Sequence, residues 1–213
     1  MEIPHVIEAL KKPLPGHVAH AELAPYRKSN AHYLKDIKPK LASTLVLLFP
    51  DKNNILHFVL IKRPQYNGVH SNQYALPGGK KEGNENKKET ALRETQEEIG
   101  IPRDEIQIIG KLSEIYVPPS NFLIFPFIGY CSSTPLFTAD QNEVDEIIKI
   151  QLDELFKNDV VKSTHKSIIH NGQRFNMSVP FLDLNGRDGW GATGAILNEL
   201  KVILSSSFNF NVS

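Results

Sequence analysis

The stretch from Gly79 to Ile101, GKKEGNENKKETALRETQEEIGI, contains the signals that decide the fold of this chain. Asn86 is a good N-cap, and Glu89 three residues later can return a hydrogen bond to its backbone, as in a capping box. Gly100 is well placed to end a helix in the left-handed conformation. The local pattern therefore predicts one short helix that starts just after Asn86 and stops before Gly100.

This helix would carry two stripes of different character. At about 100° per residue, one stripe is suited to packing, and it comprises Ala91, Leu92, Thr95 and Ile99. A neighbouring stripe contains Glu94, Glu97 and Glu98. Carboxylates this close repel one another, and they lie where the helix dipole disfavours negative charge. Because Mg²⁺ and Mn²⁺ prefer carboxylate oxygens, the three glutamates predict a platform for one of these ions.

The alternative is that these acids are solvated charges, with Arg93 and nearby lysines as casual partners. A longer pattern argues against it, namely Gly-x5-Glu-x7-Arg-Glu-U-x-Glu-Glu-x-Gly-U with U aliphatic. The residues that fit this pattern are Gly79, Glu85, Arg93, Glu94, Glu97, Glu98, Gly100 and Ile101. The segment closely resembles the signature of the Nudix hydrolase family. Thr95 stands where an aliphatic residue is usual, which is a packing position and affects no expected ligand.

The resemblance implies a fold, a reaction and roles for the signature residues. The expected fold is α+β, with an α/β/α sandwich around a mixed β-sheet. The expected reaction is hydrolysis of a nucleoside diphosphate linked to another group, with Mg²⁺ or Mn²⁺ as the cofactor. Glu94 and Glu98 are then the expected direct metal ligands, and Glu97 is either a ligand or the base that deprotonates water. The carbonyl of Gly79 is a candidate for a further ligand.

Residues around these ligands complete the expected site. Arg93 should orient a glutamate by a bidentate ion pair, with Glu85 or one of the three helix acids as its partner. The family often recruits a catalytic carboxylate from outside the helix. Glu143 is the first candidate and Glu146 the second, because both lie in an acidic turn-to-strand segment. A solvated acidic loop is the alternative interpretation of that segment.

Segments rich in aliphatic or aromatic residues predict the strands of the sheet. They are Ser43–Phe49, His57–Arg63, Ile106–Leu112, Asn121–Cys131 and Glu143–Gln151, followed by a hairpin of Val160–Ile169 and Phe175–Leu184 joined near Asn171-Gly172. Helical spacing over Gly191–Leu204 predicts a closing amphipathic helix. Strands mixed with two main helices are typical of an α/β/α sandwich around a mixed sheet, as the resemblance also implies.

The chain is long enough for one domain with extensions, because it has 213 residues of which 40% are hydrophobic. Scattered prolines before residue 40 predict a short helix followed by irregular chain. We therefore expect residues 1–40 to be an extension packed on a Nudix hydrolase domain of residues 41–204, with a tail of residues 205–213.

Composition narrows the class of partner and the compartment. Lys+Arg and Asp+Glu number 24 each, so no overall basic field favours nucleic acid or an anionic membrane. No apolar run is long enough to cross a bilayer, and the histidines have no spacing typical of a zinc site. The single cysteine, Cys131, excludes an intramolecular disulfide and suits a reducing cytoplasm. The sequence leaves the oligomeric state open between a monomer and a homodimer.

A second resemblance bears on the substrate. His70–Lys80, HSNQYALPGGK, is similar to the His-x-Gly-Gln-x-Ala-Phe-Pro-Gly-Gly-Lys stretch of coenzyme A pyrophosphatases, with Asn72 replacing a glycine and Leu76 a phenylalanine. That subfamily would split coenzyme A or its derivatives into 3′,5′-ADP and 4′-phosphopantetheine. A 3′-phosphate requires a cation, and adenine favours an aromatic surface. The candidates for these roles, each with ordinary solvation or packing as the alternative, are Lys62, Arg63, His70, Lys80, Lys81, Tyr66 and Tyr74.

Two alternatives to coenzyme A hydrolysis remain open. One is a Nudix hydrolase of another nucleotide, such as ADP-ribose, NADH or a dinucleoside polyphosphate. The other is a Nudix domain that binds a small ligand as a regulator, without catalysis. Domains of the second kind commonly lose signature acids, whereas this chain keeps all of them.

Overall fold

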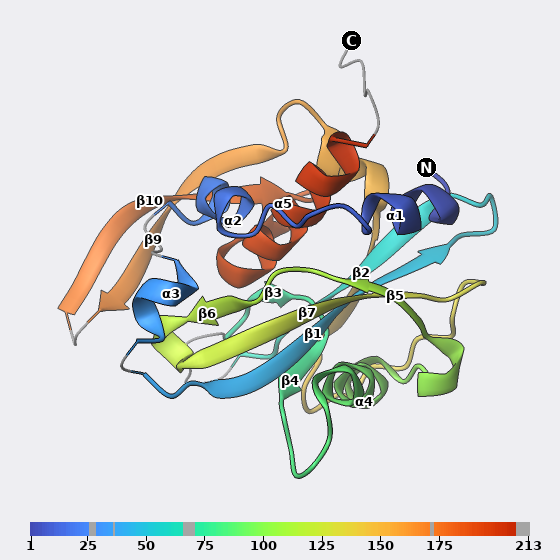
Figure 1. The fold of residues 1–213 in the computed structure, drawn as a ribbon, viewed down its shortest axis with the longest axis horizontal. Helices are drawn as coiled ribbons and strands as arrows, with labels where there is room; N and C mark the ends of the chain where they lie inside the picture. Colours follow the sequence, from blue (N-terminus) through green and yellow to red (C-terminus); the bar gives the residue numbers. More distant parts are fainter. Residues whose placement is uncertain (26–28, 36, 66–70, 171–172, 208–213) are drawn as a thin grey trace.

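A mixed β-sheet lies between two layers of helices in the computed structural model of the chain, which describes residues 1–25, 29–35, 37–65, 71–170 and 173–207 (Figure 1). The strands of this sheet are β1 (Lys40–Pro50), β2 (Leu56–Lys62), β3 (Tyr74–Ala75), β4 (Gly78–Lys80), β5 (Gln107–Lys111), β6 (Ile115–Val117), β7 (Phe122–Tyr130) and β8 (Glu146–Gln151). Neighbouring strands run in the order β3-β2-β1-β7-β5, with β4 beside β1, β6 beside β7 and β8 beside β2. β1 and β7 pair in parallel, and the other described pairs of this sheet are antiparallel. The expected mixed sheet is thus confirmed.

The central strand β1 is buried on both of its faces. Leu45 and Leu47 pack in one hydrophobic cluster with Ile99, at the end of the helix over that face. Val46 and Leu48, which alternate with them, pack in a second cluster on the opposite face. Burial on both faces explains why this strand reads as an unbroken apolar run.

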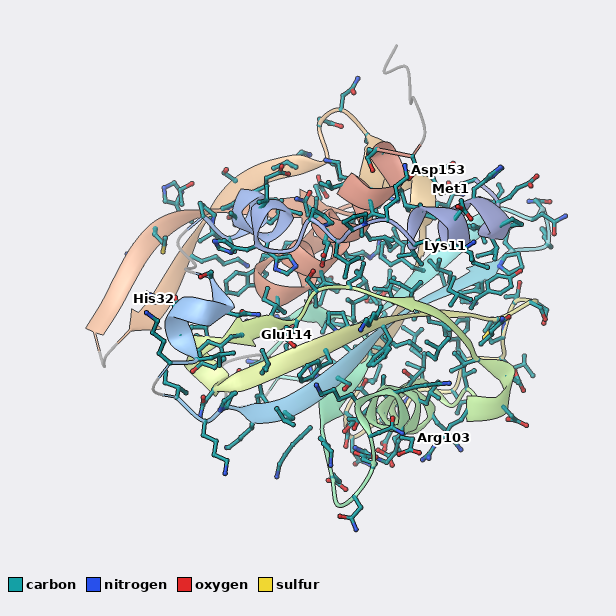
Figure 2. All side chains as sticks on the ribbon, in the orientation of Figure 1. Met1, Lys11, His32, Arg103, Glu114 and Asp153 are labelled. Atoms are coloured by element: carbon teal, nitrogen blue, oxygen red, sulfur yellow. The ribbon has the colours of Figure 1, made fainter. Side chains whose placement is uncertain are left out.

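Helices cover both faces of the sheet. α4 (Lys87–Ile99) covers one face, while α1 (Ile3–Ala9), α2 (His17–Leu23) and α5 (Gly191–Ser205) lie on the other (Figure 1). Side chains fill the space between each helical layer and the sheet (Figure 2). Shorter turns are α3 (Asn30–Tyr33) and the 3-10 helices η1 (Arg103–Glu105), η2 (Pro118–Ser120) and η3 (Leu152–Phe156). Among the described residues, no helix combines the length and apolar content that a bilayer crossing requires.

The N-terminal segment is more helical than the sequence predicted. It forms α1, α2 and α3 in place of one helix followed by irregular chain, so that prediction was wrong. Pro4 lies in the first turn of α1, and Pro13 and Pro15 precede α2. Prolines at these positions begin helices and do not interrupt them. The division of the chain at residues 40 and 204 stays a prediction.

A buried carboxylate joins this N-terminal segment to α5. Glu199 is fully buried and accepts hydrogen bonds from the backbone N–H of Gly16 over 3.1 Å and of Ser113 over 3.0 Å. Its other contact is His20 Nε2, at 3.0 Å. Burial alone would raise the pKa of Glu199, but the contacts with His20 and Ser113 outweigh this effect and lower the pKa. Glu199 therefore fixes both α2 and the turn after β5 to the last helix.

The last strands form a separate small sheet in the order β11-β10-β9. Its members are β9 (Val161–His170), β10 (Gln173–Asp183) and β11 (Asp188–Gly189), and β9 and β10 pair in antiparallel fashion. The predicted hairpin strands are thus confirmed, while the turn predicted at Asn171-Gly172 lies outside the described residues. α5 follows β11 and closes the fold where the sequence predicted its final helix.

Candidate active site

The helix α4 has the ends that the sequence predicted. The side chain of Asn86 accepts hydrogen bonds from the backbone N–H of Lys88 and Glu89, and Glu89 Oε2 accepts one from the Asn86 N–H over 2.7 Å. At the other end, Gly100 has φ of +75°, and its N–H donates to the carbonyl of Gln96. The capping box and the left-handed glycine are therefore confirmed, and they set the rotation at which the helix presents its acids.

Three carboxylates from two separate segments converge beside this helix. Glu94 and Glu98 come from α4, and Glu143 comes from the turn before β8. One carboxylate oxygen from each lies within 4.8 Å of the others. Glu98 is the innermost of the three and Glu143 is exposed, so the cluster has a buried side and a side open to solvent.

Glu98 is held by the first residue of the strand β4. Its side chain is 1% exposed, and its Oε2 accepts a hydrogen bond from the Gly78 N–H over 2.7 Å. Arg63 lies on the other side, with one guanidinium nitrogen 3.2 Å from the Gly78 carbonyl and 3.5 Å from Glu98 Oε1. Burial raises the pKa of Glu98 to about 8, against the opposing effects of Arg63 and the Gly78 N–H.

Glu94 packs directly against Gly79. A Cβ atom added to Gly79 would lie 2.4 Å from the carboxyl carbon of Glu94, so only glycine allows this approach. Burial is the largest influence on Glu94 and raises its pKa, while Arg93, 2.9 Å away, opposes the shift. Gly79 therefore brings the backbone of β4 against one of the three converging acids, while the role of its carbonyl as a metal ligand stays a prediction.

Arg93 is anchored by Glu85, as the sequence predicted. Its Nε and one terminal nitrogen donate to the two oxygens of Glu85 over 3.0 and 2.9 Å, and the Lys80 carbonyl accepts a further hydrogen bond over 2.9 Å. The hydroxyl of Thr90 and the Glu82 N–H also donate to Glu85. These hydrogen bonds, with that of Arg93 the largest effect, lower the pKa of Glu85 to about 2.

Glu97 does not join the converging carboxylates. Its side chain is 51% exposed and lies 2.6 Å from Arg93 Nη1, on the flank of the helix that faces Glu85. The expectation that three helix acids share one site was therefore wrong in geometry. Adjacent helix positions differ by about 100°, so Glu97 and Glu98 point apart while Glu94 and Glu98 lie one above the other.

The turn that carries Glu143 is tied to the end of α4. The backbone N–H groups of Thr138 and Asp140 donate to the carbonyls of Ile99 and Glu98 over 2.9 and 3.1 Å. A Cβ on Gly100 would lie 2.8 Å from the Thr138 side chain, so the glycine is needed for this contact as well as for its positive φ. Gly100 thus allows the segment before Glu143 to approach α4, which carries Glu94 and Glu98.

The predicted strand Glu143–Gln151 starts three residues later than expected, so this boundary was wrong. The carboxylate of Asp140 accepts a hydrogen bond from the backbone N–H of Asn142. The backbone carbonyl of Asp140 accepts hydrogen bonds from the backbone N–H groups of Glu143 and Val144. These hydrogen bonds form a turn that precedes β8. Glu146, the second candidate for the outside carboxylate, lies 3.7 Å from Arg187 and outside the cluster.

The candidates for substrate binding do not gather in one place. Arg63 contacts Glu98, so its positive charge already has a partner in the acid cluster. The two residues are far apart in the sequence, so no local sequence pattern indicated this pair. Lys62 is the last residue of β2 and Arg63 follows it, so Lys62 points to the opposite face of the sheet. On that face Tyr74, the partner of Lys62 in β3, packs against the second core cluster. The side chain of Lys80 is exposed, whereas His70 and Tyr66 lie outside the described residues.

The donor set fits a hard divalent cation. Three carboxylates supply the oxygen ligands that Mg²⁺ and Mn²⁺ prefer, and Glu143 exposes one side of the cluster to solvent. Two of the acids have pKa values raised by burial, so each lacks a full counter-charge that a cation would provide. The thiol of Cys131 is buried in the core, and burial raises its pKa to about 11, which disfavours the nucleophilic thiolate.

Comparison with known proteins agrees with this geometry. A family model described as "NUDIX domain" matches residues 39–171. The chain is 31% identical over 141 residues to "Uncharacterized Nudix hydrolase NudL" of Pectobacterium atrosepticum, which covers 64% of this chain and 69% of that protein. It is 28% identical over 159 residues to "Nudix hydrolase 3" of Caenorhabditis elegans, which covers 69% of this chain and 66% of that protein. The chain thus spans about two thirds of the length of these relatives.

A solved structure also has this arrangement of strands and helices. The binary complex of a C. elegans Ap4A hydrolase superposes with a TM-score of 0.52 at 13% sequence identity, covering 78% of this chain and 98% of that one. At this identity the likeness concerns the fold alone.

Proposed function

The chain belongs to the NUDIX domain family, and on that premise we propose that it is a metal-dependent hydrolase of a nucleoside diphosphate linked to another group. Members of this family are hydrolases that act on pyrophosphate bonds. The observation that carries the proposal is the convergence of Glu94, Glu98 and Glu143 within 4.8 Å, from two segments far apart in the sequence. A divalent cation would offset the repulsion among three carboxylates that lie this close together.

Glu94 and Glu98 would hold Mg²⁺ or Mn²⁺, with the Gly79 carbonyl as a further candidate ligand. When bound, the ion lowers the pKa of a water molecule and neutralises charge on the diphosphate oxygens. The Gly78 N–H and Arg63 fix the orientation of Glu98. Gly79 leaves space for Glu94, so both carboxylates are placed before the ion arrives.

We assign the base to one of two exposed carboxylates. Glu143 is the first candidate, because it is the exposed member of the acid cluster and an ionised carboxylate beside a bound cation could accept a proton from an attacking water. Glu97 is the alternative, because its side chain is half-exposed and it lies on α4 together with Glu94 and Glu98. Arg93 holds Glu97 and Glu85 in place, which makes it a positioning residue in this scheme.

For the substrate we propose coenzyme A or one of its derivatives, giving 3′,5′-ADP and 4′-phosphopantetheine. Support comes from the resemblance of His70–Lys80 to a stretch of coenzyme A pyrophosphatases. The last three residues of this segment form the strand β4, which contacts Glu94 and Glu98 of the acid cluster. Another small nucleotide, such as ADP-ribose, NADH or a dinucleoside polyphosphate, is the second candidate. A reducing compartment such as the cytoplasm is proposed from the single buried cysteine.

A hydrolysis panel tests this proposal. The chain is incubated with coenzyme A, acyl-coenzyme A, ADP-ribose, NADH and diadenosine polyphosphates, each with Mg²⁺ or Mn²⁺, and the products are separated. We expect coenzyme A to yield 3′,5′-ADP. Turnover of another compound with coenzyme A untouched would replace the substrate. Ligand binding without any turnover would favour a non-catalytic regulator.

A further inference from the structure

Ser43 has a buried hydroxyl that lacks a hydrogen-bond partner. The residue is 2% exposed, and its Oγ contacts no donor or acceptor among the described residues. Neighbouring buried hydroxyls are satisfied, because Thr44 Oγ1 donates to the Pro77 carbonyl over 2.7 Å and Thr95 Oγ1 donates to the Ala91 carbonyl over 2.7 Å. A buried hydroxyl without a partner destabilises a fold by roughly 1–3 kcal/mol, so its presence calls for a reason.

The place of Ser43 in β1 points its side chain towards the acid cluster. Leu45 and Leu47, which follow at alternate positions, pack on the face that α4 covers, so Ser43 faces the same way. Its partner across the strands β1 and β4 is Gly79. Side chains of such a pair lie on one face of the sheet, with Cβ atoms roughly 5 Å apart.

Gly79 has no side chain, and the carboxylate of Glu94 occupies the space that one would fill. Both oxygens of Glu94 lie within 2.5 Å of where a Gly79 Cβ would stand. The Ser43 hydroxyl and the Glu94 carboxylate therefore lie on the same face of the β1–β4 pair. Glu94 occupies the space that a side chain at position 79 would fill. In the structure Glu94 pairs with Arg93, 2.9 Å away, and makes no hydrogen bond to Ser43.

We propose that Ser43 is a positioning residue for the metal site: with a divalent cation bound, its hydroxyl, which has no partner in the structure, would donate a hydrogen bond to Glu94 and hold that carboxylate towards Glu98 and Glu143. The proposal rests on the proposed metal-dependent function. Hydrogen bonds to a ligating carboxylate fix its orientation, and their loss typically weakens metal affinity 10- to 100-fold. A purely structural serine would behave differently, because removing an unpartnered buried hydroxyl should leave metal binding unchanged and the fold as stable or more stable.

Direct titration of the full chain with Mn²⁺, followed by electron paramagnetic resonance or calorimetry, separates these cases without any substrate. We expect Ser43→Ala to raise the Kd for Mn²⁺ about tenfold while the melting temperature stays equal or rises. Thr95→Val is the matched control, since its buried hydroxyl is satisfied within α4. That control should keep the wild-type Kd.

A double-mutant cycle with Glu94→Gln identifies the group through which Ser43 acts. If the hydroxyl works through Glu94, Ser43→Ala should add little to the Kd of the Glu94→Gln variant. Additive effects, or an unchanged Kd in Ser43→Ala alone, would overturn the role of Ser43 and leave the metal site standing. A wild-type chain that binds no Mn²⁺ would overturn both the metal site and this role.

Discussion

The backbone N–H of Gly78 donates a hydrogen bond to Glu98 Oε2 over 2.7 Å, and this contact joins the strand β4 to the innermost acid of the cluster. The contact favours ionised Glu98, but burial is the stronger effect and raises the pKa of Glu98 to about 8. A buried carboxylate held in place yet short of counter-charge is what a cation site requires before the ion binds.

Without metal, Glu98 should make stability fall as pH rises. Its pKa in the folded chain, about 8, exceeds the ordinary value of 4.5, so the folded state binds the extra proton between these limits. Stability from this group is full below about 4.5 and is lost as pH rises through about 8. Melting curves in a chelator at pH 5–9 would measure this loss.

Glu98→Gln should remove that part of the pH dependence and abolish metal-dependent hydrolysis while the chain stays folded. The amide is isosteric and carries no charge to desolvate, so the metal-free variant should melt several degrees higher than the wild type at pH 9. Full activity of the variant with Mg²⁺ present would exclude Glu98 as an essential ligand.

Metal binding should release protons in the same pH range. Because the ion must displace the proton of Glu98, the affinity for Mn²⁺ should rise by up to about tenfold per pH unit towards pH 8 and level off above it. Calorimetry in buffers of different ionisation enthalpy counts the protons released. An affinity independent of pH between 6 and 8 would contradict this assignment.

Comparing Glu143→Gln with Glu97→Gln should identify the base. We expect Glu143→Gln to lower kcat by about 10²- to 10⁴-fold with a smaller change in the Mn²⁺ concentration needed for activity. Glu97→Gln should have the weaker effect, because Glu97 lies outside the acid cluster and pairs with Arg93. The reverse order would transfer the base to Glu97.

Gly100→Ala should destabilise the chain through two separate effects. A left-handed alanine costs about 1–2 kcal/mol, and the new Cβ would also lie 2.8 Å from Thr138. Gly83→Ala is the matched control, because Gly83 has φ of +45° and nothing within 4 Å of the added atom. Chemical denaturation should show the larger loss for Gly100→Ala, and equal losses would mean that the Thr138 segment simply moves aside.

The sequence predicted those parts of the site that depend on local structure. Asn86, Glu89 and Gly100 set the ends of α4 through contacts within a few residues, so their roles could be read directly. The resemblance also gave Glu85 as one possible partner of Arg93, with the three helix acids as the others. The caps of α4 depend on helix geometry and need no knowledge of the rest of the fold.

Long-range packing decided the rest. The packing of β2, β4 and α4 against one another buries Glu98 almost completely and brings Arg63 against it. Lys62 and Arg63 looked equivalent in the sequence, and only the alternation of the strand assigns them to opposite faces. In the N-terminal segment, helix formation depended on whether each proline precedes or interrupts a turn, which composition does not show.

The hydrogen bonds of Glu199 have a practical consequence for anyone who trims this protein. The segment matched by the family model, residues 39–171, contains Ser113 but neither α5 nor Gly16 and His20. A fragment cut at those limits would lose the helices that cover one whole face of the sheet, and exposed apolar strands of this kind promote aggregation. Fragment boundaries drawn from sequence similarity alone would therefore fall inside a unit that we expect to fold only with both its flanking segments.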